Sequence, residues 1–289
     1  MRGLSGEVAA SRLGSYWALF TAIADGVIDF DAGNEAKSYS PLVVSWVIAF
    51  ATLVSLLALG LLGFSVWPSA MDLIYGLPIG LLLAYANVVY FKALASGPMG
   101  VISAVSGIAV MVPVLYDSLI GKAPTLLSGL GMLAILFGVY LIAQDAQGSK
   151  QPGAFKTRVL IMAVVAAITY GASDVLFKRG TDTDGISLLL VIQVVECLSF
   201  SAILAMRRIK AHVRRRDLLV LAPLGLANML GWLAYTRAAQ HGQIDIVSAL
   251  IYCSPVFTLL LAHLCIGEIL SRRELLAFCT ILVGAWLVV

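Results

Sequence analysis

Two polar side chains that could bind a proton or a solute lie deep in one apolar stretch of this sequence. Glu196 is near the middle of the run 185–206, and Gln193 precedes it by three residues. Residues three apart share a helix face, and ionisable groups in membrane-length helices usually face a cavity or a partner. We predict that Glu196, with Gln193 beside it, binds a proton and a cationic solute in turn. The alternative is a purely structural glutamate, protonated or salt-bridged.

A second acidic face is predicted near the N-terminus, where Asp25 and Asp29 are four residues apart in another apolar run. This spacing places both carboxyl groups on one side of a helix. We predict that this face also takes part in solute or proton binding.

Amide and aromatic side chains at similar depth complete the predicted binding residues. Aromatic rings beside a buried acid attract organic cations, with about 0.5–2 kcal/mol per contact. For each ring alone, ordinary packing or a place in the interfacial belt is the alternative. The residues in this group are Asn87, Asn228, Tyr85, Tyr90, Trp232, Tyr235 and Tyr252.

The positions of these residues repeat along the chain. Asp29 and Asp174 are separated by 174 − 29 = 145 residues, and many Gly, Pro and Tyr residues recur at the same offset. Repeated units are a strong guide to architecture. The matching pairs are Gly26 with Gly171, Asp72 with Asp217, Pro78 with Pro223, Gly80 with Gly225, Tyr90 with Tyr235, Ala93 with Ala238, Gly97 with Gly242 and Ser103 with Ser248.

The composition requires a membrane around this duplicated chain. Of its 289 residues, 61% are hydrophobic and 12% are charged, whereas soluble domains carry about 25% charged residues. A helix needs roughly 20 apolar residues to cross the hydrocarbon core. The ranges that meet this need approximately are 13–32, 41–63, 72–94, 99–120, 125–143, 157–177, 185–206, 217–239, 245–266 and 272–289.

The span count and the duplication together predict the fold. Five spans per half is an odd number, so the second copy must enter the bilayer upside down, and a binding site is expected between the halves. The predicted fold is an all-α integral membrane protein with ten transmembrane helices in two inverted-topology repeats. The predicted domains are residues 1–143 and 157–289, joined by a linker at 144–156.

Basic and proline residues at matching places suggest moving parts. Lys92 and Arg237 end the third and eighth spans, so we predict that the pairs Asp29–Lys92 and Asp174–Arg237 are gates that open alternately. Snorkelling of the two basic side chains without coupling is the alternative. Proline kinks a helix, so we predict hinges at Pro78 and Pro223, which match, and at Pro113 and Pro255, which lie at different registers. A fixed kink that serves packing is the alternative.

The distribution of Lys and Arg predicts orientation. Thirteen of the 19 lie on the side of the loops that join spans 1 to 2, 3 to 4 and so on, and six lie on the other. Because cytoplasmic loops are enriched in these residues, we expect a multi-pass protein of the plasma (inner) membrane with both termini extracytoplasmic. A nucleic-acid partner is not expected.

Several function classes lack their motifs. The sequence has no Gly-x-x-x-x-Gly-Lys-Ser/Thr loop and no protease or hydrolase signature, so neither an enzyme nor direct drive by ATP is expected. Four Cys residues without paired spacing suggest no metal site, and we expect no cofactor. Monomer and homodimer both stay open.

The sequence resembles the EamA-type members of the drug/metabolite transporter superfamily over nearly its whole length. The resemblance is carried by Tyr235–Thr236–Arg237–Ala238, Gly242, Ser248–Ala249–Leu250, Ser254–Pro255–Val256, Gly267–Glu268 and Gly284, and by their first-half counterparts around Tyr90, Gly97 and Pro113. It departs at Lys122, where a Glu is usual, and in orientation, because such proteins usually keep both termini in the cytoplasm. The resemblance implies transport of a small organic solute by alternating access.

We therefore predict a secondary transporter for a cationic or zwitterionic metabolite, amino acid or drug, coupled to protons through the buried carboxyl groups. The alternative is an uncoupled facilitator or exporter of neutral or aromatic amino acids. An intramembrane enzyme or sensor is a third, weaker reading.

Overall fold

The computed structural model describes residues 2–63, 67–97, 99–122, 124–148, 157–181, 185–209, 214–266 and 271–288, and every regular element in these ranges is helical. The first half contains α1 (Arg2–Ser38), α2 (Pro41–Leu61), α3 (Ala70–Ser96), α4 (Met99–Ser106), η1 (Gly107–Val110), α5 (Met111–Leu119) and α6 (Leu126–Gly148). The second contains α7 (Thr157–Gly180), α8 (Gly185–Met206), α9 (Arg215–His241), α10 (Ile244–Ile251), α11 (Ser254–Leu261), η2 (Ala262–Ile266) and α12 (Arg272–Val288).

Five helical stretches in the described ranges are long and apolar enough to cross a membrane: α2, α3, α7, α8 and the stretch Ile244–Cys265. The other predicted spans fall on α1, α6, α9, α12 and the broken stretch from α4 to α5. Backbone N–H and C=O groups find no hydrogen-bond partners in lipid, and a helix pairs them within itself. The prediction of an all-α integral membrane protein is therefore supported, and the count of ten spans stays a prediction.

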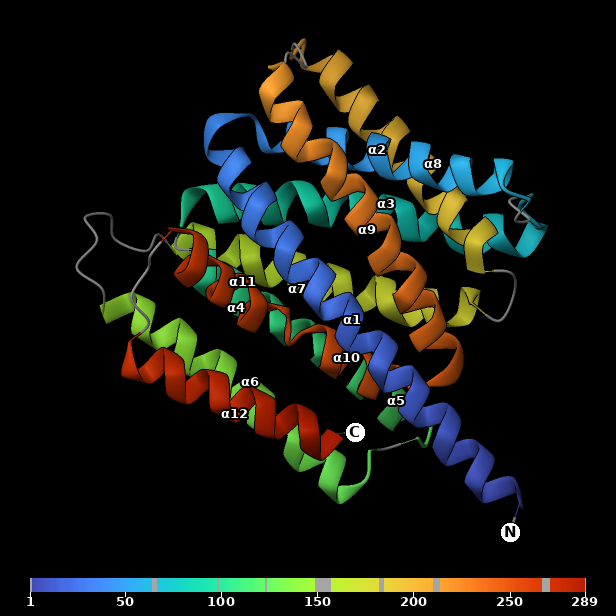
Figure 1. The fold of residues 1–289 in the computed structure, drawn as a ribbon, viewed down its shortest axis with the longest axis vertical. Coiled ribbons are helices and arrows are strands. Elements are labelled where there is room, and N and C mark those ends of the chain that lie inside the picture. The colour runs from blue at the N-terminus through green and yellow to red at the C-terminus, as the bar shows by residue number, and fades with distance from the viewer. Residues whose placement is uncertain are drawn as a thin grey trace.

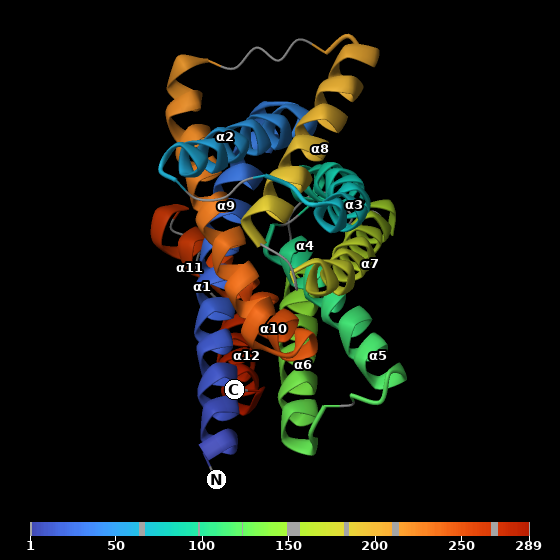
Figure 2. The ribbon, with the colours of Figure 1, turned by 90° about the vertical axis from the view of Figure 1, so that its right-hand side faces the viewer.

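The halves are interleaved, and their contacts match. Helix α1 packs on α9 as α7 packs on α3, and α2 packs on α9 as α8 packs on α3. Two equivalent pairs meet directly: α2 lies along α8 on one side of the bundle, and α6 lies along α12 on the opposite side (Figures 1 and 2). The core is consequently shared between the halves.

Close helix contacts depend on glycines that the repeat offset singled out. A Cβ at Gly26 would collide with Phe257 in α11, and a Cβ at Gly171 would collide with Val112 in α5. Both pairs keep the same offset, because 171 − 26 and 257 − 112 each equal 145. Small residues let membrane helices approach closely, so the duplicated glycines hold each half against the other.

Both halves break a helix at the same relative position. The stretch from α4 to α5 passes through the 3-10 turn η1, and a turn at residues 252–253 separates α10 from α11. Pro113 and Pro255 lie in the first turn of the helices that follow these breaks, where a missing N–H is tolerated. Pro78 and Pro223 lie inside the continuous helices α3 and α9. Their hinge role stays a prediction.

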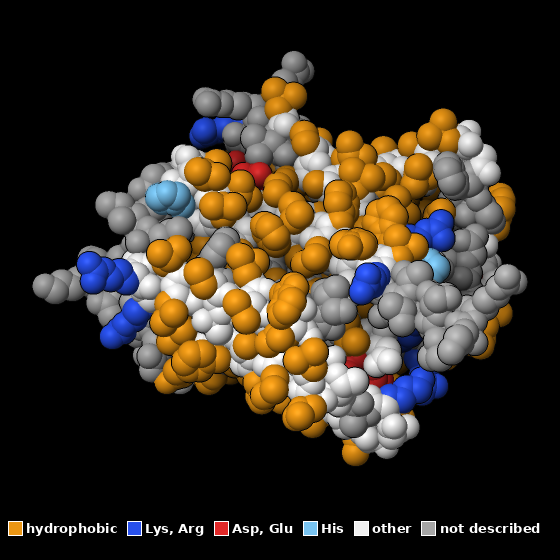
Figure 3. All heavy atoms as spheres, turned by 60° about the horizontal axis from the view of Figure 1, so that its bottom comes forward, with side chains coloured by type: hydrophobic (Ala, Val, Ile, Leu, Met, Phe, Trp, Pro, Cys, Tyr) orange, Lys and Arg blue, Asp and Glu red, His pale blue; other side chains and the backbone are white. Residues whose placement is uncertain are grey.

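The described surface is largely apolar. Leu61, Trp67, Leu126 and Trp286 are each more than three-quarters exposed. Figure 3 shows hydrophobic side chains across the middle of one face, with most Lys and Arg toward its left and right ends. Such extensive exposure is unusual for a soluble monomer and fits a bundle surrounded by lipid.

The predicted linker at 144–156 begins too early, because residues 144–148 continue helix α6. Its remaining residues, 149–156, lie outside the described ranges. The domain boundaries at 143 and 157 stay a prediction.

The contact at Gly225 gives a test of this packing. Its added Cβ would meet the Cβ of Ala51, with the carbonyl carbon of Ala51 and the backbone nitrogen of Thr52 each at 2.8 Å. We expect Gly225→Ala to destabilise the protein by about 1–3 kcal/mol through overpacking, measured as a lower midpoint of thermal unfolding in detergent. The control is Gly129→Ala in α6, where nothing lies within 4 Å. Equal unfolding midpoints for the two variants would refute the close contact.

Candidate functional site

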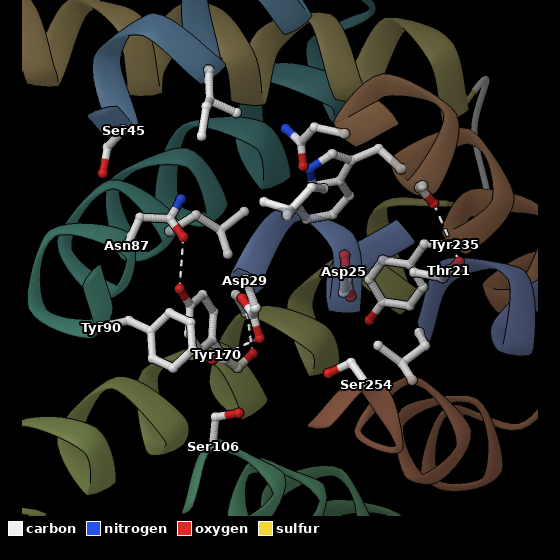
Figure 4. A pocket seen from close by; sticks show the side chains of 18 of the residues that line it. Thr21, Asp25, Asp29, Ser45, Asn87, Tyr90, Ser106, Tyr170, Tyr235 and Ser254 are labelled. Carbon is white, nitrogen blue, oxygen red and sulfur yellow. Dashed lines mark hydrogen bonds between the residues drawn. The ribbon is translucent and has the colours of Figure 1, made fainter. Parts of the chain in front are cut away.

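A polar cavity of about 150 Å³ lies between the halves. A cavity of that size accepts a ligand as small as benzene, so it suits a small solute. Helices α1, α2, α3, α7, α8 and α9 supply its walls, and residues at both helix breaks complete them. Figure 4 shows part of this lining, which includes Thr21, Asp25, Asp29, Ser45, Asn87, Tyr90, Ser106, Tyr170, Ser173, Asp174, Glu196, Asn228, Trp232, Tyr235, Tyr252 and Ser254.

Asp29 is held by two hydroxyl groups of its own half. The phenol of Tyr90 donates a 2.7 Å hydrogen bond to Oδ2 of Asp29, and Ser103 donates one of 3.2 Å to the same oxygen. Asp29 is 9% exposed. Hydrogen bonds to charged groups contribute about 1.5–3 kcal/mol each, so these donors offset part of the cost of burying a carboxyl group.

Asp174 has the equivalent environment in the second half. Tyr235 donates a 2.7 Å hydrogen bond to Oδ1, and Ser248 donates one of 3.2 Å to Oδ2. A third donor, Tyr252, lies 2.9 Å from Oδ2. The repeat therefore preserves a three-residue cluster in space, and the second copy adds one phenol.

Glu196 is buried at 3% exposure and is held by amides. Asn87 donates a 2.8 Å hydrogen bond to Oε1, and Gln193 donates one of 2.5 Å to Oε2. Tyr170 donates in turn to the side-chain Oδ1 of Asn87 at 2.6 Å. This chain of hydrogen bonds joins α3 of the first half to α7 and α8 of the second.

Asp25 differs from the other three acids of the cavity. It is only partly buried, and its carboxyl group forms no hydrogen bond with the described residues. Tyr170 occupies the equivalent place in the second half, since 170 − 25 = 145. Asp25 is thus the carboxyl group with the most capacity left for a ligand.

The electrostatic character of the cavity is one-sided. Its described lining contains four carboxyl groups and no Lys, Arg or His. Six of its described side chains are aromatic, namely Tyr90, Phe91, Tyr170, Trp232, Tyr235 and Tyr252. Acids with aromatic rings favour an organic cation or a zwitterion over an anion. Among the described residues, no three His, Cys, Asp or Glu side chains group to hold a metal.

The predicted gate pairs Asp29–Lys92 and Asp174–Arg237 are not formed in this structure. Lys92 and Arg237 are exposed, while the two aspartates bind Tyr90 and Tyr235. The reason is helix geometry: each basic residue follows its tyrosine by two positions, about 200° around the helix. When the phenol points into the cavity, the basic side chain points out of it.

The same geometry corrects the prediction for Tyr85. Its side chain is 55% exposed and lies outside the cavity, because Asn87, two residues later, points inward. Gln193 does not line the cavity either; it is 1% exposed and supports Glu196 from the same helix face, as the three-residue spacing indicated. The other predicted binding residues all line the cavity, and solute binding by them stays a prediction.

The sequence interpretation missed the role of several hydroxyl groups. No role was predicted for Tyr170, Ser103 and Ser248. The offset of 145 nevertheless paired Ser103 with Ser248, as it paired the tyrosines and the aspartates. Co-occurrence of Asp, Tyr and Ser at one repeat offset was the signal for a shared cluster. Thr21, Ser45, Ser106, Ser173 and Ser254 carried no such signal.

The unequal number of donors gives a test of the two clusters. Tyr90→Phe leaves Asp29 with one hydroxyl donor, whereas Tyr235→Phe leaves Asp174 with two. We expect both variants to be destabilised, Tyr90→Phe more strongly, by about 1.5–3 kcal/mol in thermal unfolding. Tyr16→Phe, which changes an exposed phenol, is the control. A Tyr90→Phe protein as stable as this control would contradict the assigned hydrogen bond.

Comparison with known proteins gives a matching fold for the whole chain and a matching family model for its second half. A solved structure titled only "Crystal structure of protein" matches with a TM-score of 0.78 and 18% sequence identity, over 97% of this chain and 96% of that chain, which shows the fold alone. No curated protein matches the sequence. The model of the EamA-like transporter family matches residues 157–289. This match over the second half supports membership of the EamA/drug/metabolite transporter superfamily.

Proposed function

We propose that the protein is a secondary transporter that moves a small organic cation or zwitterion across the membrane by alternating access. The observation that carries this proposal is the cavity between the halves, lined by four carboxyl groups and several aromatic rings without a described basic side chain. The family supports transport of a small solute, and the charge of the cavity supports the sign of that solute.

Alternating access has two supports in the helix arrangement. Broken helices line the cavity in both halves, through Ser106 before η1 and through Tyr252 and Ser254 around the second break. Discontinuous helices at the interface of inverted repeats are typical of secondary transporters. The reciprocal contacts of the halves suit two inverted bundles that rock against each other. A conformational change of this kind would expose the cavity to each side in turn.

Within this proposal, Asp25 contacts the cationic group of the solute. Its carboxyl group reaches the cavity without an internal hydrogen bond among the described residues, and Trp232 and Tyr235 lie on the same cavity. Asp29 and Asp174 are already engaged by hydroxyl donors. A cation that binds Asp25 needs to displace no protein donor.

Proton coupling is assigned to Glu196. It lies in the cavity wall at the end of a hydrogen-bonded chain that crosses between the halves. A carboxyl group in an apolar bundle is costly to ionise, so a proton and a cation are alternative ways to neutralise it. Exchange between these two ligands couples their movements in opposite directions.

A second candidate function is an uncoupled facilitator or exporter of neutral or aromatic amino acids. The hydrogen bonds of Asp29, Asp174 and Glu196 favour it, because acids with that many internal partners can be purely structural. The aromatic walls suit such solutes equally well.

Solute charge is tested by uptake into proteoliposomes that contain the purified full chain, with choline-like amines, polyamines, amino acids and organic anions as solutes. We expect cations or zwitterions to be taken up, and Asp25→Asn to reduce the apparent affinity about tenfold or more, since a charged hydrogen bond contributes about 1.5–3 kcal/mol. Asp31→Asn, on the same helix but outside the cavity, is the control. Preferred uptake of anions, or no effect of Asp25→Asn, would contradict the proposal.

Coupling is tested in the same vesicles with an imposed pH gradient. We expect the gradient to drive solute accumulation in the wild type, and Glu196→Gln to abolish this drive while downhill exchange persists, because glutamine cannot release a proton. The Asp31→Asn protein should behave as the wild type. Accumulation that ignores the pH gradient, together with unchanged uptake of aromatic amino acids by Glu196→Gln, would favour the uncoupled facilitator.

A further inference from the structure

A second hollow lies on the outside of the bundle, away from the cavity of the four carboxyl groups. This groove has a volume of about 710 Å³ and runs between α3 and α8, with the start of α2 and Met162 of α7 at its edges. Tyr85 and Lys92, which the sequence placed in the cavity and at a gate, both line it. The proposed transport path leaves this groove without a role.

The two basic residues of the groove lie at the same end of the bundle. Gly80 of α3 packs against Val195 of α8, and the earlier contact of Gly76 with Val191 shows that the two helices run in the same direction. Lys92 follows Gly80 by twelve residues, and Arg207 follows Val195 by twelve. Because the two offsets from this contact are equal and the helices run in the same direction, both cations lie at about the same level, near the ends of α3 and α8.

The length of the groove corresponds to one leaflet. Along α3 the lining runs from Leu81 to Lys92, a rise of 92 − 81 = 11 residue steps or roughly 16 Å of helix. Half of the hydrocarbon core is about 15 Å. Between these limits the α3 side presents Val88 and Val89, and the α8 side presents Ala202 and Ile203. The walls are thus mainly apolar over the depth of an acyl chain, with Tyr85 and Ser199 as the polar side chains among them.

The charge of the groove is opposite to that of the cavity. Lys92 and Arg207 are exposed, and their side chains form no hydrogen bond or ion pair with any residue that the structure describes. Among the residues that the structure describes, no Asp or Glu lines the groove, whereas Ser40 does. An Arg guanidinium with a Lys ammonium is well suited to a phosphate group. The Lys and Arg distribution also predicts that this end, with its loop 207–216, faces the leaflet richer in anionic lipid.

We propose that the groove between α3 and α8 is a binding site for an anionic phospholipid, with its headgroup phosphate at Lys92 and Arg207 and one acyl chain along the apolar walls. The lipid bridges a helix of each half at the level where α3 and α8 end. This inference does not depend on the identity of the transported solute.

Native mass spectrometry of the delipidated full chain tests this site, with phosphatidylglycerol and phosphatidylcholine of identical acyl chains as probes. We expect wild-type protein to retain phosphatidylglycerol preferentially. Each basic residue is expected to contribute about fivefold and the two together about thirtyfold, so Lys92→Gln with Arg207→Gln should remove the preference. Lys37→Gln, an exposed lysine that contacts Asn34 outside the groove, should keep it.

A second pair of variants tests the acyl path without a change of charge. Ala202→Phe fills the groove and should reduce phosphatidylglycerol retention, whereas Ala205→Phe, exposed on the same helix outside the lining, should not. Excess inorganic phosphate should not displace the lipid. Equal retention of the two lipids by the wild type would overturn the proposal. So would unchanged retention in both Ala202→Phe and the doubly neutralised protein, or displacement by phosphate alone.

Discussion

Burial of carboxyl groups in an apolar bundle is the constraint on which the rest of this structure depends. Asp29, Asp174 and Glu196 are each at most 9% exposed, and an unpartnered charge at such sites would cost several kcal/mol. Each is held instead by phenol, serine or amide donors. The positions of those donors fix how α3 faces α1 and how α9 faces α7.

The duplication makes this solution available twice. Asp29 accepts hydrogen bonds from Tyr90 at 2.7 Å and from Ser103 at 3.2 Å, both at Oδ2. Asp174 accepts them from Tyr235 and Ser248 at the same distances, although at Oδ1 and Oδ2 respectively. Glu196 breaks the symmetry, because its amide partners come from both halves and no acid occupies the matching part of α2. The cavity therefore combines two equivalent aspartates, Asp29 and Asp174, with a glutamate that has no counterpart in the other half.

Side chains two residues apart on α3 and on α9 point in opposite directions, one into the cavity and the other out of it. Tyr90 and Asn87 line the cavity, while Lys92 and Tyr85 line the outer groove. The cavity and the basic outer groove are therefore lined in part by neighbouring residues of one helix, α3. This arrangement keeps the basic side chain of Lys92 out of the cavity that contains the four carboxyl groups.

The sequence by itself determined the helical class, the repeat offset, the approximate positions of the helices and most of the acids and aromatic rings of the cavity. Helix α1, Arg2–Ser38, extends well beyond the predicted span 13–32. Apolar run length and a fixed offset are properties of the chain alone, so they needed no coordinates. The partners of Asp29 and Asp174 were decided by the tertiary structure. Tyr90 and Lys92 are two residues apart, so the sequence alone does not tell which of them reaches Asp29. The rotation of α3 against α1 decides that the phenol, rather than the ammonium, reaches the buried carboxyl group.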